Sequence, residues 1–431
     1  MGRLARFFDL SAKGTSIQIE VLAGVSTFLS LSYIFVVNPA ILSQAGMDKS
    51  AVLFATIAAS ALATIAMGLW PNLPFVLAPG MELNAYVAFF VVGSLGFNWR
   101  QALGAVFWSG VLFIVLTVAQ IRKKVIESIP TRMKAALALS VGVFLFLVAL
   151  KVAGLLIYDG VRLVGVGGLS SRTALIFYIG LVLVLILERF KVRGSVLITI
   201  IIATVLCHYF GLNDNAEQPT RISRNMLADL GGLDLRVIIQ PRMLSVILIL
   251  FLIDFYGSIA KFIGLSQNTS LVVDGELPHL KDALLIDGAA TVLGSTLGTS
   301  SIIVYVESAV GIGAGGRTGL TAITCGILML GCFALTSLFG LVPIVATTGA
   351  LAFVGIKLCP SLKELRTYSP VDLIALILMP LAVIVTFAID RAMLIGFGVY
   401  AFADLIKLRK LNPYMVGSMI LLAIGAYLQM R

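Results

Sequence analysis

The sequence predicts an all-α, polytopic membrane protein with fourteen transmembrane segments in two inverted repeats of seven spans. Hydrophobic residues make up 59% of the 431 residues, and charged residues make up only 12%, about half the roughly 25% of a soluble domain. Apolar runs long enough to cross the ~30 Å hydrocarbon core recur along the whole chain. The breaks between these runs are short and contain charged, Gly, Pro or Asn residues. No soluble domain fits between them.

The apolar windows, taken in order, give the expected spans. In the first half they are 19–42, 51–69, 74–92, 101–121, 134–157, 173–188 and 195–211. In the second half they are 243–264, 283–297, 301–316, 319–341, 344–359, 371–389 and 392–408, followed by a last run at 413–430. Either this last run is a fifteenth crossing or one of the short late segments does not span the membrane.

Basic residues gather in alternate loops and predict the sidedness of the chain. Arg3, Arg6 and Lys13 precede the first apolar run, which is too long and lacks the cleavage site of a removable signal peptide. Further basic clusters follow the fourth, sixth, twelfth and fourteenth spans: Arg122–Lys124, Arg189–Arg193, Lys357–Arg366 and Lys407–Lys410. Because cytoplasmic loops carry an excess of Lys and Arg, we expect these loops and the N-terminus in the cytoplasm. The net charge of +10 is explained in this way, so no nucleic-acid partner is predicted.

The longest polar insert, 211–242, divides the chain into two halves. Because each half has an odd number of spans, the halves must have opposite orientations, as in inverted-repeat transporters. The third span of each half is interrupted: Pro79 and Gly80 break one, and Gly294–Ser301 opens the other. Interrupted spans at corresponding positions indicate a transporter's substrate site, where unwound backbone lines a cavity or is buried in protein. The sequence therefore predicts one central pocket.

Two carboxylates in the middle of expected spans are candidate substrate-binding and proton-coupling groups. Asp254 lies in the eighth span and Glu307 in the tenth. An ionisable side chain at the bilayer centre costs about 3 kcal/mol or more, so it indicates a functional site. We expect both to face the pocket and to accept hydrogen bonds from substrate N–H groups. The structural alternative for Asp254 is an ion pair with Lys261, which lies on the same face of the helix.

Other polar and aromatic residues near the two breaks complete the candidate site. Asn84 offers both a donor and an acceptor to a flat polar ligand, although an amide can also cap a helix. Ser300 and Ser301 precede the helical part of the tenth span, where free backbone N–H groups suit a carbonyl or an anion. Aromatic side chains near the breaks are candidates for stacking on a planar ring, and we select Phe75, Phe255 and Tyr305 from a set that also includes Tyr86, Phe89 and Tyr256.

Three further ionisable residues are expected to modulate the site. They are Glu82, close to Asn84; Lys261, in the eighth span; and Asp287, in the ninth, which we expect to be structural more than substrate-facing. No spacing of His, Cys or acidic residues indicates a metal site or a disulfide. A nucleophile with a base is also missing from the pattern, so the sequence does not predict an enzyme.

Four stretches of the sequence carry a family pattern. They are Glu20–Phe28 with Tyr33–Leu42, Ala78–Tyr86, Phe251–Asp254, and Gly298–Ser301 with Tyr305–Gly311. In these stretches the chain resembles the nucleobase-cation symporter-2 family, in its AzgA-like purine permease branch. The resemblance implies fourteen spans in two inverted sevens, with short β-strands in spans 3 and 10. It also implies a core domain, 1–128 and 243–341, that moves against a gate domain, 129–242 and 342–431.

The same resemblance implies an activity. Asn84, Asp254 and Glu307 match substrate-binding positions. The expected function is import of a nucleobase, and specifically of a purine, by proton symport. The expected transport mechanism is an elevator-like movement. A proton is the coupling ion, and no other cofactor is expected. We expect a multi-pass protein of the bacterial inner (plasma) membrane, with its N-terminus in the cytoplasm. The expected partners are the nucleobase substrate and the lipid bilayer. A homodimer is the oligomeric state that we expect, if the protein assembles at all.

The chain departs from the family pattern near the expected site. Where the purine branch has a second acid three residues after Asp254, this chain has Gly257, and Lys261 replaces part of a Thr-x-Gly-Thr run. Glu82 replaces the small residue after Pro-Gly-Met. The new lysine and the new carboxylate could pair as a salt bridge, or could change the ligand preference and the proton coupling.

Two other functions stay open at this point. An anion transporter of the same fold would use helix ends and a basic residue, so Lys261 favours that interpretation and Glu307 opposes it. A membrane-embedded enzyme would need a nucleophile with its base or a metal cluster, for which the sequence gives no support.

Overall fold

The computed structural model describes residues 3–119, 131–159, 162–192, 194–212, 232–267, 269–273, 276–360, 365, 367–406 and 413–430. Helices predominate. Within these residues, six helices are long and apolar enough to cross a membrane: Ile17–Ser43, Lys49–Leu69, Trp99–Val118, Ala135–Val152, Pro241–Ser266 and Gly319–Gly340. Several shorter apolar helices accompany them. The chain is therefore a multi-pass membrane protein.

Several of the basic loop residues that predict sidedness lie outside the described residues. They are Arg122–Lys124, Arg193, Lys363, Arg366 and Lys407–Lys410, together with residues 213–231 of the polar insert.

The helices of the first half follow the expected spans closely. They are α1 (Arg3–Phe7), α2 (Ile17–Leu31), α3 (Ile34–Ser43), α4 (Lys49–Leu69), α6 (Trp99–Val118), α8 (Thr131–Val152), α9 (Arg172–Arg189) and α10 (Ser195–Tyr209). The expected first span is in fact two helices, α2 and α3. At the break, the Ser32 hydroxyl donates to the Leu29 carbonyl, 3.2 Å away, a local hydrogen bond that competes with the helical ladder.

The second half also follows the expected order. Its helices are α12 (Pro241–Ser266), α13 (Leu280–Leu297), α14 (Ser308–Gly313), α15 (Gly319–Gly331), α16 (Thr336–Gly340), α17 (Thr348–Lys357), α19 (Pro370–Thr386), α20 (Ile389–Ile406) and α21 (Pro413–Met430). Three 3-10 turns, Leu235–Ile239, Cys332–Leu335 and Ile344–Thr347, connect or precede them. The expected eleventh span is divided between α15 and α16 by one of these turns. The last apolar run forms α21, which packs against α12 and α20.

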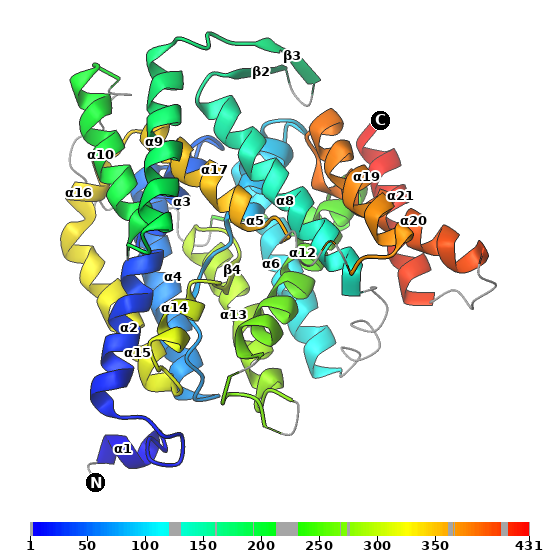
Figure 1. Cartoon of the computed structure of the whole chain (residues 1–431). Coiled ribbons are helices and arrows are strands. Elements are labelled where there is room, and N and C mark those ends of the chain that lie inside the picture. The colour runs from blue at the N-terminus through cyan, green and yellow to red at the C-terminus, as the bar shows by residue number, and fades with distance from the viewer. Residues whose placement is uncertain are drawn as a thin grey trace.

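The expected third and tenth spans are broken by short strands, as predicted. Strand β1 (Leu77–Pro79) pairs with β4 (Ile302–Val304) in antiparallel register, with Ala78 opposite Ile303. Pro79 has no N–H, so it cannot donate to the ladder at its own position. β1 continues into α5 (Met81–Ala85) and a π-helix, Tyr86–Val92. Figure 1 shows β4 in the middle of the molecule, surrounded by helices.

A second two-stranded sheet corrects the all-α expectation. Strands β2 (Leu156–Asp159) and β3 (Arg162–Val166) form an antiparallel hairpin directly after α8. The expected fifth span runs to residue 157, but the helix ends at Val152. Gly154 adopts a left-handed φ of 71°, and the Leu155 N–H bonds the Leu150 carbonyl at 2.9 Å, which is the bond of a Schellman helix end. The hairpin lies at the end of the molecule opposite α1 (Figure 1).

The most extensive helix contacts fall within two groups. In the first, α4 packs against α15, α6 against α13, α2 against α15, and α12 against α6. In the second, α8 packs against α17 and α19, α17 against α9, and α19 against α20. The two groups meet along a seam, where α5 contacts α8 and α12 contacts α21.

Glycines allow close backbone approach inside each group. In the first group, a Cβ atom at Gly319 would collide with the Gly68 backbone. In the second group, a Cβ atom at Gly142 would collide with the Gly355 carbonyl. Only glycine fits such contacts, which are a common way of packing helices in membranes. Each group is therefore tightly packed internally.

Candidate functional site

The crossing of β1 and β4 brings the two broken spans together. The Gly80 N–H bonds the Ser301 carbonyl at 2.9 Å, and the Tyr305 N–H bonds the Val76 carbonyl at 2.9 Å, so the ladder extends beyond the strands. The Tyr305 hydroxyl also donates to the Pro79 carbonyl at 2.7 Å. Glu82 and Asn84 follow one strand, and Glu307 follows the other. Segments far apart in the sequence thus form one polar region beside α12, which contacts both β4 and α5.

A cavity of about 300 Å³ lies at the seam between the two groups of helices. One wall comes from α5, α12 and the second residue after β4, and the other comes from α8 and the end of α17. Its lining residues are Glu82, Leu137, Ala138, Val141, Ile253, Tyr256, Gly257, Ala260, Lys261, Gly264, Leu265, Val306 and Leu358. The volume is at the lower end of the ~300–1,000 Å³ of small-ligand pockets, and mostly apolar walls with a few polar groups are typical of them.

An ion pair is the main polar feature of this cavity. Lys261 Nζ lies 3.0 Å from Glu82 Oε1, and the two side chains are 16% and 17% exposed. These are two residues at which the chain departs from the family pattern. The expectation that they could pair as a salt bridge is confirmed. The structural alternative for Asp254 is not observed, because Lys261 pairs with Glu82 instead.

Asp254 is buried among hydroxyl groups of the neighbouring elements. Its Oδ2 accepts hydrogen bonds from Thr291 Oγ1 at 2.9 Å and from Ser301 Oγ at 2.7 Å, and Ser258 Oγ lies 3.4 Å from its Oδ1. The Thr291 and Ser301 hydroxyls are themselves 2.8 Å apart. Asp254 therefore joins α12 to α13 and to the residue before β4. It is not among the residues that line the 300 Å³ cavity.

Glu307 keeps one oxygen free of protein partners. Its Oε1 accepts a hydrogen bond from the Tyr33 hydroxyl at 2.8 Å, whereas its Oε2 is buried without a hydrogen-bond partner. The preceding residue, Val306, lines the cavity. Lys261 interacts electrostatically with both Glu307 and Asp254. A buried, free carboxylate oxygen is a suitable acceptor for a ligand N–H or a proton.

An amide and hydroxyl network lies on the other side of the crossing. Asn84 Nδ2 donates to Asn38 Oδ1, and Asn38 Nδ2 donates to Thr56 Oγ1 at 2.7 Å and to Thr299 Oγ1 at 2.9 Å. Asn84 Oδ1 and the Ser300 hydroxyl are buried without a partner. Asn38 was not predicted as a site residue from the sequence. A single amide side chain inside the first apolar run nevertheless indicates a functional position.

The three predicted stacking residues do not line the cavity. Phe75 packs edge-to-face on Phe262 with ring centroids 5.1 Å apart, and Phe255 packs on Phe113 at 4.9 Å. Tyr305 is held by its hydrogen bond to Pro79. The aromatic residue in the cavity wall is Tyr256. A stacking role for Phe75, Phe255 and Tyr305 stays a prediction.

Asp287 is fully buried in α13. Neither of its carboxylate oxygens makes a hydrogen bond of normal geometry, although the Ser258 hydroxyl and the Val304 N–H lie near it. It also interacts electrostatically with Asp254. Of the three residues expected to modulate the site, Glu82 and Lys261 thus line the cavity, while Asp287 lies within the core.

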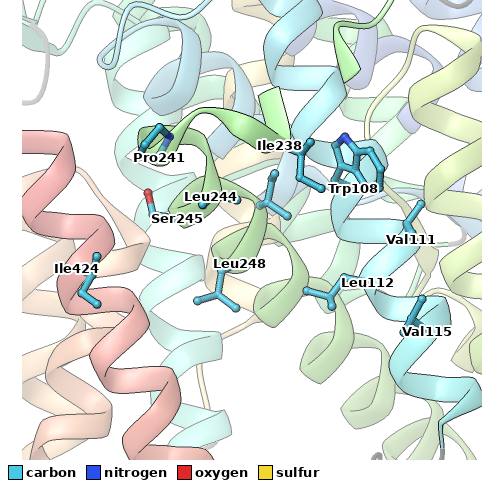
Figure 2. Close-up of a pocket in the computed structure, with 11 residues that line it drawn as sticks. Trp108, Val111, Leu112, Val115, Ile238, Pro241, Leu244, Ser245, Leu248 and Ile424 are labelled. Atoms are coloured by element: carbon cyan, nitrogen blue, oxygen red, sulfur yellow. The ribbon is translucent and has the colours of Figure 1, made fainter. Parts of the chain in front are cut away.

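A larger cavity of about 470 Å³ lies between α6, α12 and α21. Figure 2 shows its walls, from Trp108 and Val115 on α6 to Ile424 on α21. Its lining is almost wholly apolar. The indole N–H of Trp108 is bonded to the Leu235 carbonyl, and the Ser245 hydroxyl to the Arg242 carbonyl. A polar ligand finds no charged group in these walls, so the smaller cavity is the candidate site.

Comparison with known proteins agrees with the membrane-transporter architecture. A sequence profile described as the permease family matches residues 18–395. The chain belongs to this permease family. It is 35% identical over 428 residues to the adenine permease AdeP of Escherichia coli (strain K12), covering 96% of this chain and 94% of AdeP. It is 31% identical over 430 residues to the guanine/hypoxanthine permease PbuO of Bacillus subtilis (strain 168), covering 98% and 100%.

Two solved structures share the fold of this permease. The transmembrane domain of the cyanobacterial bicarbonate transporter BicA matches with a TM-score of 0.63 at 15% identity, over 95% of this chain and 97% of that one. The murine anion transporter Slc26a9, in its inward-facing state, matches with a TM-score of 0.64 at 12% identity, over 90% and 68%. These likenesses concern the fold alone. The family resemblance found in the sequence is confirmed, and the protein is a permease and not an enzyme.

Proposed function

We propose that this permease imports a nucleobase, a purine in the first place, by proton symport through the 300 Å³ cavity. One observation carries the proposal: Glu82, which follows β1, and Lys261, on α12, pair in the wall of a single cavity of ligand size, and Val306, next to Glu307, lines the same cavity. The relatives support it, because two of them are permeases of adenine and of guanine and hypoxanthine.

The cavity suits a planar ring that carries N–H donors and acceptors at its edge. Apolar side chains such as Leu137 and Val141, with Tyr256, would cover the ring faces. The free oxygens of Glu307 and Asn84 would accept ring or amino N–H groups. The hydrogen bond between Asp254 and Ser301 would fix the position of β4 relative to α12. In this way apolar walls provide the binding surface, and a few polar groups fix the orientation.

The proposed movement follows from the two groups of helices. The core would comprise residues 1–128 and 243–341, and the gate 129–242 and 342–431, in fourteen spans arranged as two inverted sevens. Support comes from the packing, because helices at corresponding positions of the two halves make corresponding contacts. The α4–α15 contact has its counterpart in α6–α13, and the α2–α15 contact has its counterpart in α6–α12. The cavity lies between the two groups, so an elevator-like shift of the core would carry the ligand with it.

Proton coupling would use Glu307 and Asp254. A carboxylate that takes up a proton loses its charge, and a neutral group costs far less to move through a low-dielectric barrier. The proposed setting is the inner membrane of a bacterium, with the N-terminus in the cytoplasm. An anion as substrate is less well supported, because the ammonium of Lys261 is already neutralised by Glu82.

Uptake of labelled bases tests the proposal. Cells that lack their own nucleobase permeases should accumulate one or more of hypoxanthine, guanine, adenine, xanthine and uracil when they express this protein, and a protonophore should abolish the accumulation. Glu307→Gln should lower uptake about a hundredfold, because a neutral amide cannot exchange the proton. Uptake at the wild-type rate in this variant would refute the role of Glu307. Inhibition by bicarbonate or sulfate, and not by bases, would support an anion instead.

A further inference from the structure

We infer that the Glu82–Lys261 pair determines substrate specificity, and that it discriminates between 6-oxopurines and 6-aminopurines. The inference rests on the proposed transport of nucleobases through the 300 Å³ cavity, and it concerns which base is accepted. The pair lines this cavity from α5 and α12.

The ion pair leaves hydrogen-bonding capacity facing the cavity. An ammonium has three N–H donors, and a carboxylate has two acceptor oxygens. The contact between Lys261 Nζ and Glu82 Oε1 uses one donor and one oxygen. Within the described part of the chain, Lys261 makes no other hydrogen bond and Glu82 Oε2 accepts none. A ligand can therefore meet a donor and an acceptor side by side without separating the pair.

Space for the ring lies next to these groups. Gly257 is one helical turn before Lys261 on the same face of α12, and both line the cavity. A Cβ atom at Gly257 would meet no atom within 4 Å. A planar ring lying over Gly257 would direct its edge toward Lys261 and Glu82.

The two purine classes present opposite edges to such a pair. A 6-oxopurine has a carbonyl acceptor next to a ring N–H donor, whereas a 6-aminopurine has an amino donor next to a ring nitrogen acceptor. A ring held in one orientation by the rest of the site matches the pair in one order and opposes it in the other. In the matching order the ammonium donates to the carbonyl or ring nitrogen, and the carboxylate accepts the ring or amino N–H. Both hydrogen bonds are then charge-assisted, which makes them the stronger kind.

Exchange of the two charges is the sharpest test. The variant E82K/K261E keeps an ion pair but reverses the positions of donor and acceptor, while E82Q/K261M removes both charges. We expect the wild type to prefer one of hypoxanthine and adenine over the other in kcat/KM by about tenfold or more. In E82K/K261E this preference should fall by about tenfold or invert, and in E82Q/K261M the ratio should approach unity. A ratio that is unchanged in E82K/K261E would overturn the inference.

Modified bases test the same point on the wild-type protein and do not depend on the folding of any variant. 1-Methylhypoxanthine lacks the ring N–H donor, and unsubstituted purine lacks the carbonyl. Unsubstituted purine lacks the amino group as well, so each should compete with the preferred labelled base about tenfold or more weakly than that base itself. Equal competition by all three would overturn the inference. If the wild type takes up no base at all, the proposed function fails first, so the two failures are distinguishable.

Discussion

At the scale of single residues, the buried polar groups around the β1–β4 crossing form two clusters with different tasks. In one, Thr291 and Ser301 satisfy Asp254; in the other, Asn38 satisfies the amide nitrogen of Asn84. Nearly all buried polar groups in proteins have partners, so the exceptions need an explanation. Here three residues with an unpaired atom, Asn84, Ser300 and Glu307, are predicted to bind substrate, whereas Asp287, whose two oxygens are also unpaired, is predicted to be structural.

Asn38 is predicted to hold Asn84 in place. In Asn38→Ala, the amide of Asn84 and the hydroxyls of Thr56 and Thr299 lose a common partner. We expect a loss of about 1–3 kcal/mol in stability, the usual cost of an unsatisfied buried group, together with a raised KM for the base. Thermal unfolding in detergent and uptake kinetics measure the two effects.

Asn98→Ala is the matched control for that prediction. Asn98 caps α6 at its N-terminus, away from the crossing, so the substitution should cost about 1 kcal/mol in stability and leave KM unchanged. Equal KM values for Asn38→Ala and the wild type would show that Asn38 has no positioning role.

Sequence reasoning identified the acidic and amide residues but not their partners. Asp254, Glu307 and Asn84 are visible because a polar residue in an apolar run is conspicuous. Their hydrogen-bond partners come from other helices, so no local pattern reveals them. The same reason explains why Glu82 and Lys261 line the cavity in place of Phe75 and Phe255. Which face of a helix meets a cavity depends on how the helices pack against one another.

At the scale of elements, most boundaries follow from the apolar runs alone. α4, α9 and α13 begin and end within three residues of the expected spans, because charged and small polar residues mark the ends of apolar runs. The β2–β3 hairpin was missed because Leu156, Ile157 and Tyr158 continue the apolar run of α8. The signal for it was Gly154, whose positive φ ends the helix.

Gly257 gives a prediction at this scale. The residue lies within α12 and lines the cavity, and a side chain there meets open space. Gly257→Leu should fill the cavity and lower uptake about tenfold or more, while fold and expression are retained. Helix propensity favours the change by up to about 1 kcal/mol, so thermal stability should not fall.

Gly398→Leu provides the matched control. Gly398 lies within α20, away from the cavity, and a Cβ atom there also meets nothing within 4 Å. This variant should transport at about the wild-type rate, measured in the same uptake assay. Equal rates for both leucine variants would place the substrate outside the 300 Å³ cavity.

At the scale of the whole molecule, contacts between loops agree with the sidedness that the charges predict. Lys357 Nζ at the end of α17 lies 2.6 Å from Glu188 Oε1 at the end of α9, so the loops after the sixth and twelfth spans share a side. Asn72, after the second span, bonds the Phe8 carbonyl near the N-terminus. The β2–β3 hairpin, after an odd-numbered span, lies at the opposite end (Figure 1).

The native cysteines test this sidedness. Cys207, Cys325 and Cys332 are buried, whereas Cys359, in the loop after α17, is exposed. A membrane-impermeant maleimide should therefore label the protein in inside-out vesicles and not in intact cells. Cys359→Ser should remove the labelling. Modification of Cys359 in intact cells would place this loop, and with it the N-terminus, outside.

The overall plan was predictable because the bilayer constrains it. A chain whose apolar runs predict odd-numbered halves, each with an interrupted span, has few ways to fold in a membrane. The seam between the helix groups was expected from the family resemblance, but its shape was not. The close contacts at Gly142 and Gly319 decide where helices touch, and a glycine in an apolar run does not identify its partner.

In the proposed elevator movement, the Glu82–Lys261 pair would also limit the work that the membrane voltage does on Lys261. An unpaired ammonium carried across the full field exchanges about 2.3 kcal/mol of electrical work for every 100 mV. A carboxylate 3.0 Å away that travels with it cancels this work almost completely. In the proposed cycle, the resting potential would therefore act on the proton-coupling carboxylates Asp254 and Glu307, while the Glu82–Lys261 pair would add almost no electrical work to the return stroke.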